Sequence, residues 1–486
     1  MRAGVIDAFA PAQEMLLDLR SGRMSSLELI DLHLERIARF NPALNAVVTL
    51  DPEAARRAAR EADAERTRSD RRPLLGLPVT IKDSIDVRGL PTTSGLRRRR
   101  DQIATVDAPA VARLRATGAV ILGKTNLPPY TGDWQTENKL FGRSNNPWDL
   151  ERTPGGSTGG GAAAVAAGLS PLEIGSDIGG SIRLPAAFCG IYGHRPSDSL
   201  LPRSGQFPGA TLPNPGAVLN VMGPLARGAA DLELALEVMA GPETGEEPWR
   251  IELPPPRHER LDEYRVAVLP WIDWQPVDPE VCRCLEDLAA ELERLGARTG
   301  RAQPEAMADL WRHHLLYHTL MAAMFSFNAA QSEEEARAEA ASLQAGGDEL
   351  GVARAAGLRL SAHRFLELLA ERERYRESYR DFFREWDVLL TPAAIVPAFR
   401  HQPEGDEQRG FTIGGARVDY WRLAVYPGIA TFSGQPATAF PAGRTGGGLP
   451  IGLQAVGPYL EDRTPIHFAR LLAEHFGGYE RPPGYE

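Results

Sequence analysis

The chain has 486 residues, of which 43% are apolar and 24% are charged, as is usual for globular proteins. Its formal net charge of −10 argues against a nucleic-acid-binding protein, because such proteins are usually basic. The three cysteines give no disulfide framework, and there is neither a signal-peptide pattern nor a run of about 18 apolar residues that could span a membrane. We therefore expect a soluble, cytoplasmic protein that binds neither nucleic acid nor membrane.

The first 70 residues have the pattern of an N-terminal layer of helices. Ser25 and Glu28 predict a capping box at the start of one helix. We expect residues 41–42, which are Asn-Pro, to end that helix, because the residue before a proline disfavours helical geometry. Residues 51–52, which are Asp-Pro, predict the start of a second helix that reaches about Arg66.

Short apolar runs alternate with helical patterns in the next part of the chain. Residues 79–81 and 120–122 predict two strands, with a helix over 107–117 between them. Residues 162–167 are rich in alanine and predict a small buried helix, and residues 172–174 predict the next strand. This alternation predicts an α/β fold with a largely parallel sheet, whose functional loops gather at the strand ends.

The C-terminal half of the chain has a different pattern. Residues 242–260 are rich in proline and glutamate and predict an exposed connection. Residues 281–295 predict an amphipathic helix, and residues 307–387 are almost wholly helical in pattern. Residues 426–459 return to short apolar runs with glycine and proline, which predict further strands of the sheet.

Two glycine-rich loops each present one serine, Ser157 and Ser181. Glycine lets the backbone approach a ligand closely, and consecutive backbone N–H groups can stabilise an oxyanion. Ser181 has the setting of a nucleophile, with the N–H groups of Ile178, Gly179 and Gly180 beside its own as an oxyanion hole.

Lysine is rare, occurring only as Lys82, Lys124 and Lys139 among 54 basic residues. Arginine supplies positive charge elsewhere but cannot lose its proton, so a lysine is expected where a neutral amine is needed. Lys82 ends a predicted buried strand, where burial could lower its pKa from ~10.4 by the roughly three units that a base at neutral pH requires. Ser157 would then relay the proton between Lys82 and Ser181.

Several motifs occur in order with regular spacing: GLPVTIKD (76–83), GKTN (123–126), NPWD (146–149), TPGGSTGG (153–160), GSDIGGSIR (175–183) and PAAFCG (185–190). They resemble the motifs of the amidase signature family, and the resemblance covers residues 74–223 and again 449–463. It implies a single α/β/α sandwich around a twisted mixed sheet. Within one domain over 1–486 we expect the following parts: an N-terminal helical layer (1–70), a catalytic core (74–223), a variable, mainly helical substrate-side region (245–400) and returning strands (426–465).

The resemblance also implies roles for individual residues. Ser181 would form the acyl-enzyme, Ser157 would follow a cis peptide bond and act as the bridging acid and base, and Lys82 would be the neutral general base. Asp177 and Arg183 would brace the Ser181 loop. Residues 130–135 resemble the acyl pocket of general bacterial amidases, which makes the following residues candidate substrate contacts: Thr131, Gly132, Asp133 and Trp134.

The implied activity is hydrolysis of a carboxamide C–N bond in a small molecule, with esters and carbamates as further candidate substrates. It requires neither cofactor nor metal, and we expect a monomer or homodimer. One alternative is an ammonia-releasing amidotransferase subunit of a larger complex, and another is a catalytically inactive binding protein. The presence of all three catalytic residue types argues against the latter.

Other arrangements of candidate residues are weaker. Gly155-x-Ser157-x-Gly159 matches the nucleophile elbow of α/β-hydrolases, but polar, proline-broken residues precede it where that elbow needs a strand. His194 is another candidate base, although it lies in a predicted turn with no acidic partner evident. His314 and His318 have helical spacing for a zinc pair, but no third ligand is suitably spaced.

Overall fold

The computed structural model describes residues 7–66, 72–206, 218–246, 248–328, 331–403 and 409–486. Within these ranges, eleven strands form one large mixed sheet. Their spatial order is β1 (Val47–Leu50), β3 (Val120–Thr125), β2 (Pro78–Lys82), β6 (Leu172–Asp177), β8 (Val221–Ala226), β7 (Tyr192–Arg195), β14 (Ala437–Arg444), β15 (Pro450–Val456), β11 (Val388–Pro392), β9 (Arg265–Val268) and β10 (Arg298–Arg301).

Parallel pairing is confined to two groups of strands, β3–β2–β6 and β11–β9–β10. The strands β8, β7, β14 and β15 lie between these groups and pair antiparallel throughout. The expectation of a largely parallel sheet is therefore wrong, and the mixed sheet implied by the family resemblance is confirmed. Local alternation of strands and helices predicts parallel units, but it does not determine that the returning β14–β15 hairpin pairs antiparallel with its neighbours.

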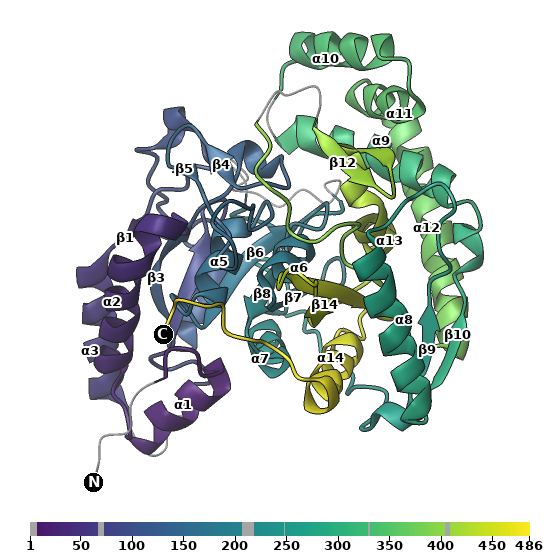
Figure 1. Ribbon diagram of the computed structural model, residues 1–486. Coiled ribbons are helices and arrows are strands. Elements are labelled where there is room, and N and C mark those ends of the chain that lie inside the picture. Colours follow the sequence, from purple (N-terminus) through teal and green to yellow (C-terminus); the bar gives the residue numbers. More distant parts are fainter. Residues whose placement is uncertain (1–6, 67–71, 207–217, 247, 329–330, 404–408) are drawn as a thin grey trace.

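Helices cover both faces of this sheet (Figure 1). The alternation of side chains along β9 separates the two cores, because Val266 and Val268 lie in one apolar cluster and Ala267 lies in the other. The first cluster contains residues of α1 (Ala12–Ser21), α4 (Pro109–Ala116), α7 (Ala229–Met239), α8 (Pro279–Arg294) and α14 (Arg463–Phe476). The second contains residues of α5 (Gly159–Ala166), α6 (Arg183–Cys189), α9 (Leu310–Asn328), α12 (Ala362–Glu385) and α13 (Val425–Ser433). The fold is therefore an α/β/α arrangement.

The N-terminal helices α2 (Ser26–Leu44) and α3 (Pro52–Glu65) pack beside β1 and β3 at one edge of the sheet (Figure 1). The Ser25–Glu28 capping box is present, as predicted. Pro42 does not end α2, because it lies in the last turn, where its fixed φ suits a helix and its missing N–H removes a single hydrogen bond. The last residues of the chain return to this edge, where Arg36 Nη2 donates to the Tyr485 carbonyl at 2.6 Å.

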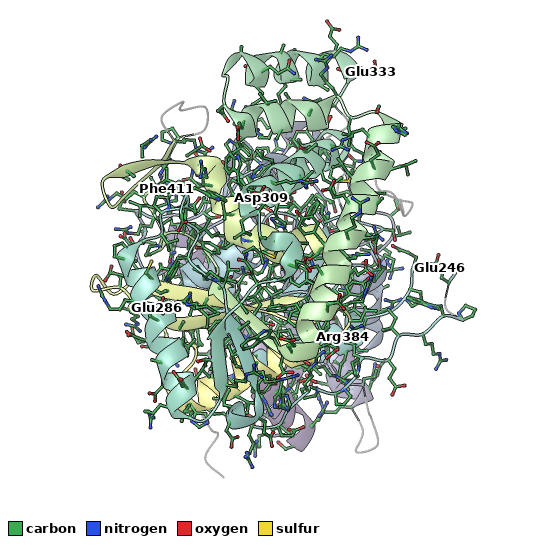
Figure 2. The ribbon with its side chains drawn as sticks, turned by 90° about the vertical axis from the view of Figure 1, so that its right-hand side faces the viewer. Glu246, Glu286, Asp309, Glu333, Arg384 and Phe411 are labelled. Atoms are coloured by element: carbon green, nitrogen blue, oxygen red, sulfur yellow. The ribbon has the colours of Figure 1, made fainter. Side chains whose placement is uncertain are left out.

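The predicted helical region after residue 307 consists of α9, α10 (Glu333–Ala345), α11 (Glu349–Leu358) and α12. Helices α10 and α11 pack on each other, α11 packs on α9, and the α10–α11 pair stands out from the body of the molecule (Figure 1). In the side view of Figure 2, Glu333 at the start of α10 lies at the opposite end of this helical region from Arg384 near the end of α12.

The C-terminal part contains strands, as predicted, and also one helix that was not expected. Strands β14 and β15 lie within the predicted range, but residues 425–433 form α13 instead of a strand. Pro427 lies in the first turn of α13, where its missing N–H has no intrahelical partner to lose, and Gly434, with a φ of 78°, ends the helix. Because one sheet takes strands from residues 47 to 456, we infer a single domain. Among the described residues, no helix combines the length and apolar character needed to cross a bilayer.

Candidate active site

Lys82 lies at the end of β2, where the sheet and helix α5 exclude water completely. Its Nζ lies 2.7 Å from Ser157 Oγ, 3.0 Å from Thr158 Oγ1 and 3.0 Å from Ser176 Oγ. These three hydroxyls surround the amine without supplying a carboxylate as a direct ion-pair partner. The arrangement therefore suits an amine that is neutral for part of its working cycle.

Burial lowers the pKa of Lys82 from its ordinary value of 10.5 to about 7, against the opposing effect of the Asp177 and Glu173 carboxylates. An amine with a pKa near neutrality is balanced between accepting and returning a proton. Lys124 is also buried, but its Nζ lies 3.3 Å from Asp83 Oδ1 and forms an ion pair, so its role is structural. Lys139 lies exposed on the surface.

Ser157 lies in the loop that leads into α5, and the Gly156–Ser157 peptide bond is cis. Gly156 is required there, because a Cβ at this position would lie 2.6 Å from the Asp133 carbonyl oxygen. No strand immediately precedes Ser157 in the described chain. A nucleophile elbow needs such a strand, so the α/β-hydrolase alternative is wrong.

Ser181 lies in the turn between β6 and α6 and is almost fully buried. Two side chains hold the carbonyl groups of this turn: Tyr317 Oη donates to the Ile178 oxygen at 2.7 Å, and Trp134 Nε1 donates to the Gly179 oxygen at 2.7 Å. The Thr158 N–H donates to the Ser181 backbone carbonyl oxygen at 3.1 Å, which connects the two serine loops. The structure thus brings Lys82, the Ser157 loop and the Ser181 loop into one site.

Asp177 and Arg183 form a fully buried, bidentate ion pair under the Ser181 turn. Burial alone would raise the pKa of Asp177, but Arg183 and nearby backbone donors hold it at about 2, so the carboxylate stays charged. Arg183 Nη1 also donates to the Pro427 carbonyl and to Gln454 Oε1, which anchors the turn to α13 and β15. The pair thus lies beneath the turn for which the family resemblance implied a bracing role.

The expected set of oxyanion donors needs one correction. The Gly180 N–H donates to Asp177 Oδ1 at 3.0 Å, so it is already engaged by the loop itself. In the described part of the chain, the N–H groups of Ile178, Gly179 and Ser181 donate to no protein acceptor. The carboxylate thus uses one N–H to shape the turn, and the remaining donors are available to a ligand.

A small hollow at Ser181 is lined by the four residues named as candidate substrate contacts, Thr131, Gly132, Asp133 and Trp134. The Asp133 carboxylate accepts from Arg409 Nη2 at 2.7 Å and from Tyr420 Oη at 2.5 Å. These bonds connect the pocket wall to the segment after residue 409. A wider cavity of about 580 Å³ adjoins the hollow and shares four lining residues with it: Gly132, Met321, Phe325 and Trp421.

Two residues of the site were not singled out from the sequence. Ser176 lies within a recognised motif, and its place at the end of β6, near Lys82, was the signal that could have identified it. Tyr317 belongs to the part of the chain after residue 245, where nothing in the sequence indicated that it would contact the Ser181 turn.

The histidine candidates are engaged elsewhere or stand alone. His194 lies in strand β7 instead of a turn, and its ring nitrogens contact Thr438 Oγ1 at 2.9 Å and Asp462 Oδ1 at 3.1 Å, an acidic partner 268 residues away. The rings of His314 and His318 lie 4.4 Å apart. Across the ranges given above, no three His, Cys, Asp or Glu side chains gather as a metal site would need.

Comparison with known proteins is consistent with this geometry. The family model for amidases matches residues 28–465. The indoleacetamide hydrolase of Bradyrhizobium diazoefficiens is 32% identical over 452 residues, which cover 91% of this chain and 82% of that protein. One subunit of the glutamyl-tRNA(Gln) amidotransferase of Thermus thermophilus is 33% identical over 493 residues, which cover 95% of this chain and 96% of that protein.

Solved structures have the same fold over nearly the whole chain. The 6-aminohexanoate cyclic dimer hydrolase, solved with its substrate, superposes with a TM-score of 0.79 at 26% identity and covers 99% of this chain and 100% of its own. A bacterial aryl acylamidase of the amidase signature group superposes with a TM-score of 0.79 at 24% identity, covering 98% and 99%, which supports the fold alone.

Proposed function

The chain belongs to the amidase signature family, and on that premise we propose that it hydrolyses the C–N bond of a carboxamide through an acyl-enzyme on Ser181. The single observation that carries the proposal is the buried Lys82 amine, 2.7 Å from Ser157 Oγ and with a pKa of about 7. A neutral amine in that position can accept a proton from a hydroxyl, which an arginine or an exposed lysine could not do at neutral pH.

In the proposed first step, Ser181 Oγ attacks the substrate carbonyl carbon while its proton passes to Ser157, whose own proton passes to Lys82. The carbonyl oxygen becomes an oxyanion, which the N–H groups of Ile178, Gly179 and Ser181 stabilise. When the intermediate collapses, the C–N bond breaks, and the leaving amine takes a proton from Ser157, which Lys82 replenishes.

In the second step, water replaces the amine. It loses a proton to Ser157 and Lys82 as it attacks the acyl carbon, and the Ser181 ester is cleaved to a carboxylic acid. The proton returns to Ser181 Oγ, so the site ends in its starting state. The Asp177–Arg183 ion pair takes no part in these transfers, and its role is to hold the turn that carries the oxyanion donors.

The test is acylation of the purified chain by a fluorophosphonate and hydrolysis of a simple aryl amide. Ser181→Ala should abolish both, because it removes the attacking oxygen. Thr158→Ala is the matched control, since Thr158 Oγ1 also contacts Lys82 Nζ at 3.0 Å but has no place in the proposed transfer. Labelling of the Ser181→Ala variant at the wild-type rate would refute the proposal.

A second candidate is an amidotransferase subunit that releases ammonia to a partner enzyme, which the similarity to the Thermus thermophilus protein favours. We keep a monomer or homodimer without cofactor as the primary expectation, with esters and carbamates as additional candidate substrates. Hydrolysis of an aryl amide by the chain alone supports the free-standing amidase. Activity that appears only with a partner complex supports the second candidate instead.

A further inference from the structure

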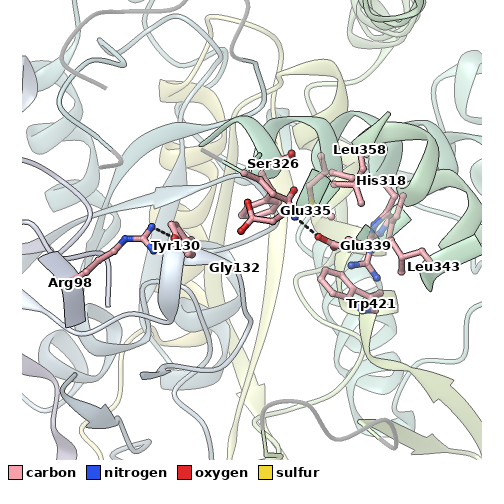
Figure 3. Close-up of a pocket in the computed structure, with 15 residues that line it drawn as sticks. Arg98, Tyr130, Gly132, His318, Ser326, Glu335, Glu339, Leu343, Leu358 and Trp421 are labelled. Atoms are coloured by element: carbon pink, nitrogen blue, oxygen red, sulfur yellow. Dashed lines mark hydrogen bonds between the residues drawn. The ribbon is translucent and has the colours of Figure 1, made fainter. Parts of the chain in front are cut away.

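The wider cavity beyond Ser181 is lined by residues of α9, α10 and α11 and by Trp421 (Figure 3). Arg98 and Tyr130 face it from the other side, where Arg98 Nη2 donates to Tyr130 Oη. The cavity is large enough for most of a small-molecule substrate, since ligand pockets usually measure ~300–1,000 Å³. Its polar groups therefore indicate what chemistry that substrate carries.

Arg354 brings to this cavity a positive charge that forms no ion pair within the described residues. Its guanidinium stacks over Trp421, with Cζ 3.7 Å from the ring centroid. Two carboxylates also line the cavity and stay charged, because their hydrogen-bond donors are neutral: Glu335 accepts from Ser332, and Glu339 accepts from Gln331.

The position of Arg354 makes this charge available to a ligand. Burial lowers the pKa of Arg354, because desolvation of the guanidinium outweighs the more distant attraction of Glu339 and Asp419. Stacking on an indole holds the guanidinium plane and leaves its N–H edge free to donate. An arginine held in this way is suited to bind a carboxylate through two parallel hydrogen bonds.

His318 supplies a second unmatched polar group in the same cavity. Its side chain is fully buried, and neither ring nitrogen has a partner in the described structure. Its ring lies 6.3 Å from that of Trp421, and burial together with His314 and Arg354 holds its pKa well below the ordinary value, so it is neutral. A buried imidazole without a partner is costly, and one N–H remains for a ligand to accept.

We propose that this cavity binds a carboxylate carried by the amide substrate, with Arg354 as the ion-pair partner and His318 as a hydrogen-bond donor. Two aromatic rings, Trp421 and Trp134, lie in edge contact at 5.3 Å between Arg354 and the Gly179 carbonyl of the Ser181 turn. The carboxylate must therefore be several bonds from the scissile amide. This inference rests on the proposed function and narrows its substrates to amides with a distal acid group.

The test compares matched substrates: the 4-nitroanilides of succinic, glutaric and adipic half-acids and their neutral methyl esters. We expect the wild type to prefer one acid over its ester by roughly 10–100-fold in kcat/KM, as an ion pair of this kind supplies. Arg354→Gln should remove that preference by raising KM for the acids. Its kcat/KM for release of 4-nitroaniline from the methyl esters should stay within about twofold of wild type. Arg354→Lys should restore part of it, and His318→Phe should reduce it.

Arg359→Gln is the matched control, because Arg359 caps the same helix but lies exposed outside the cavity. An unchanged acid preference in Arg354→Gln, or an equal loss on acids and esters, would overturn the inference. A wild type that shows no acid preference at any of the three lengths would also overturn it. Fluorophosphonate labelling of Ser181 is measured in parallel. A wild type that is not labelled would contradict the proposed function and not the carboxylate site.

Discussion

Replacement of Lys82 by arginine keeps a positive charge at this position but removes the ability to lose a proton. Burial lowers the pKa of Lys82 from 10.5 to about 7. Because one pKa unit corresponds to ~1.4 kcal/mol, the site disfavours the charged amine by about 5 kcal/mol. A guanidinium cannot lose its proton to escape this penalty, so Lys82→Arg should bury a permanent charge that the surrounding hydroxyls only partly satisfy.

We expect Lys82→Arg to lose on the order of 10²–10⁴-fold in kcat/KM for an aryl amide, the usual contribution of a general base. It should be nearly as inactive as Lys82→Ala and less stable than wild type in thermal unfolding. Lys82→Met is the control for packing, because it keeps an unbranched side chain and removes both the charge and the base. We expect it to be inactive but more stable than Lys82→Arg.

Steady-state kinetics and thermal melts of these variants decide the question together. The reasoning fails if Lys82→Arg retains activity close to wild type, because a fixed positive charge would then be sufficient. It also fails if Lys82→Arg unfolds at or above the wild-type temperature, because the site would then not disfavour charge.

Three further predictions concern the pH dependence of the reaction and two buried positions, Gly161 and Arg183. The kcat/KM of the wild type should rise with pH through about 7, because the active form of Lys82 is the deprotonated one and its pKa is about 7; a flat profile between about pH 5 and pH 9 would contradict this. Gly161→Ala should lower the free energy of unfolding by ~1–3 kcal/mol in denaturant titrations, because its Cβ would lie 2.4 Å from a buried carboxyl side chain, whereas Gly447→Ala, with no atom closer than 3.6 Å, should not. Arg183→Lys should reduce both kcat and the melting temperature, because one ammonium cannot replace the bidentate pairing with Asp177; a variant with wild-type kcat would show that the pair does not shape the turn.

Much of the fold followed from local patterns. The buried strand that ends at Lys82, the alanine-rich helix α5 and the capping box of α2 each depend on residues close in the chain, and each lies where it was expected. Two of the expectations that were wrong share a cause. Strand β7 and helix α13 depend on which other segments pack against them, so the local sequence around Pro427 or His194 was insufficient.

The candidate site divides in the same way. Ser157 and Ser181 could be named from the sequence because each stands in a glycine-rich loop, and Lys82 because it is one of only three lysines and ends a predicted buried strand. The engaged N–H of Gly180 could not be foreseen, since it depends on the orientation that the Asp177 carboxylate adopts in the folded loop.

The sequence alone therefore determined which residues could carry the chemistry and that the fold would be of the α/β type. Only the tertiary structure decided the state of Lys82, because the lowered pKa comes from complete burial among segments that lie far apart in the chain. It also decided the shape and charge of the cavity beyond Ser181, since Arg354 and His318 come from a helical region without recognisable motifs and meet Trp421 only when the chain is folded.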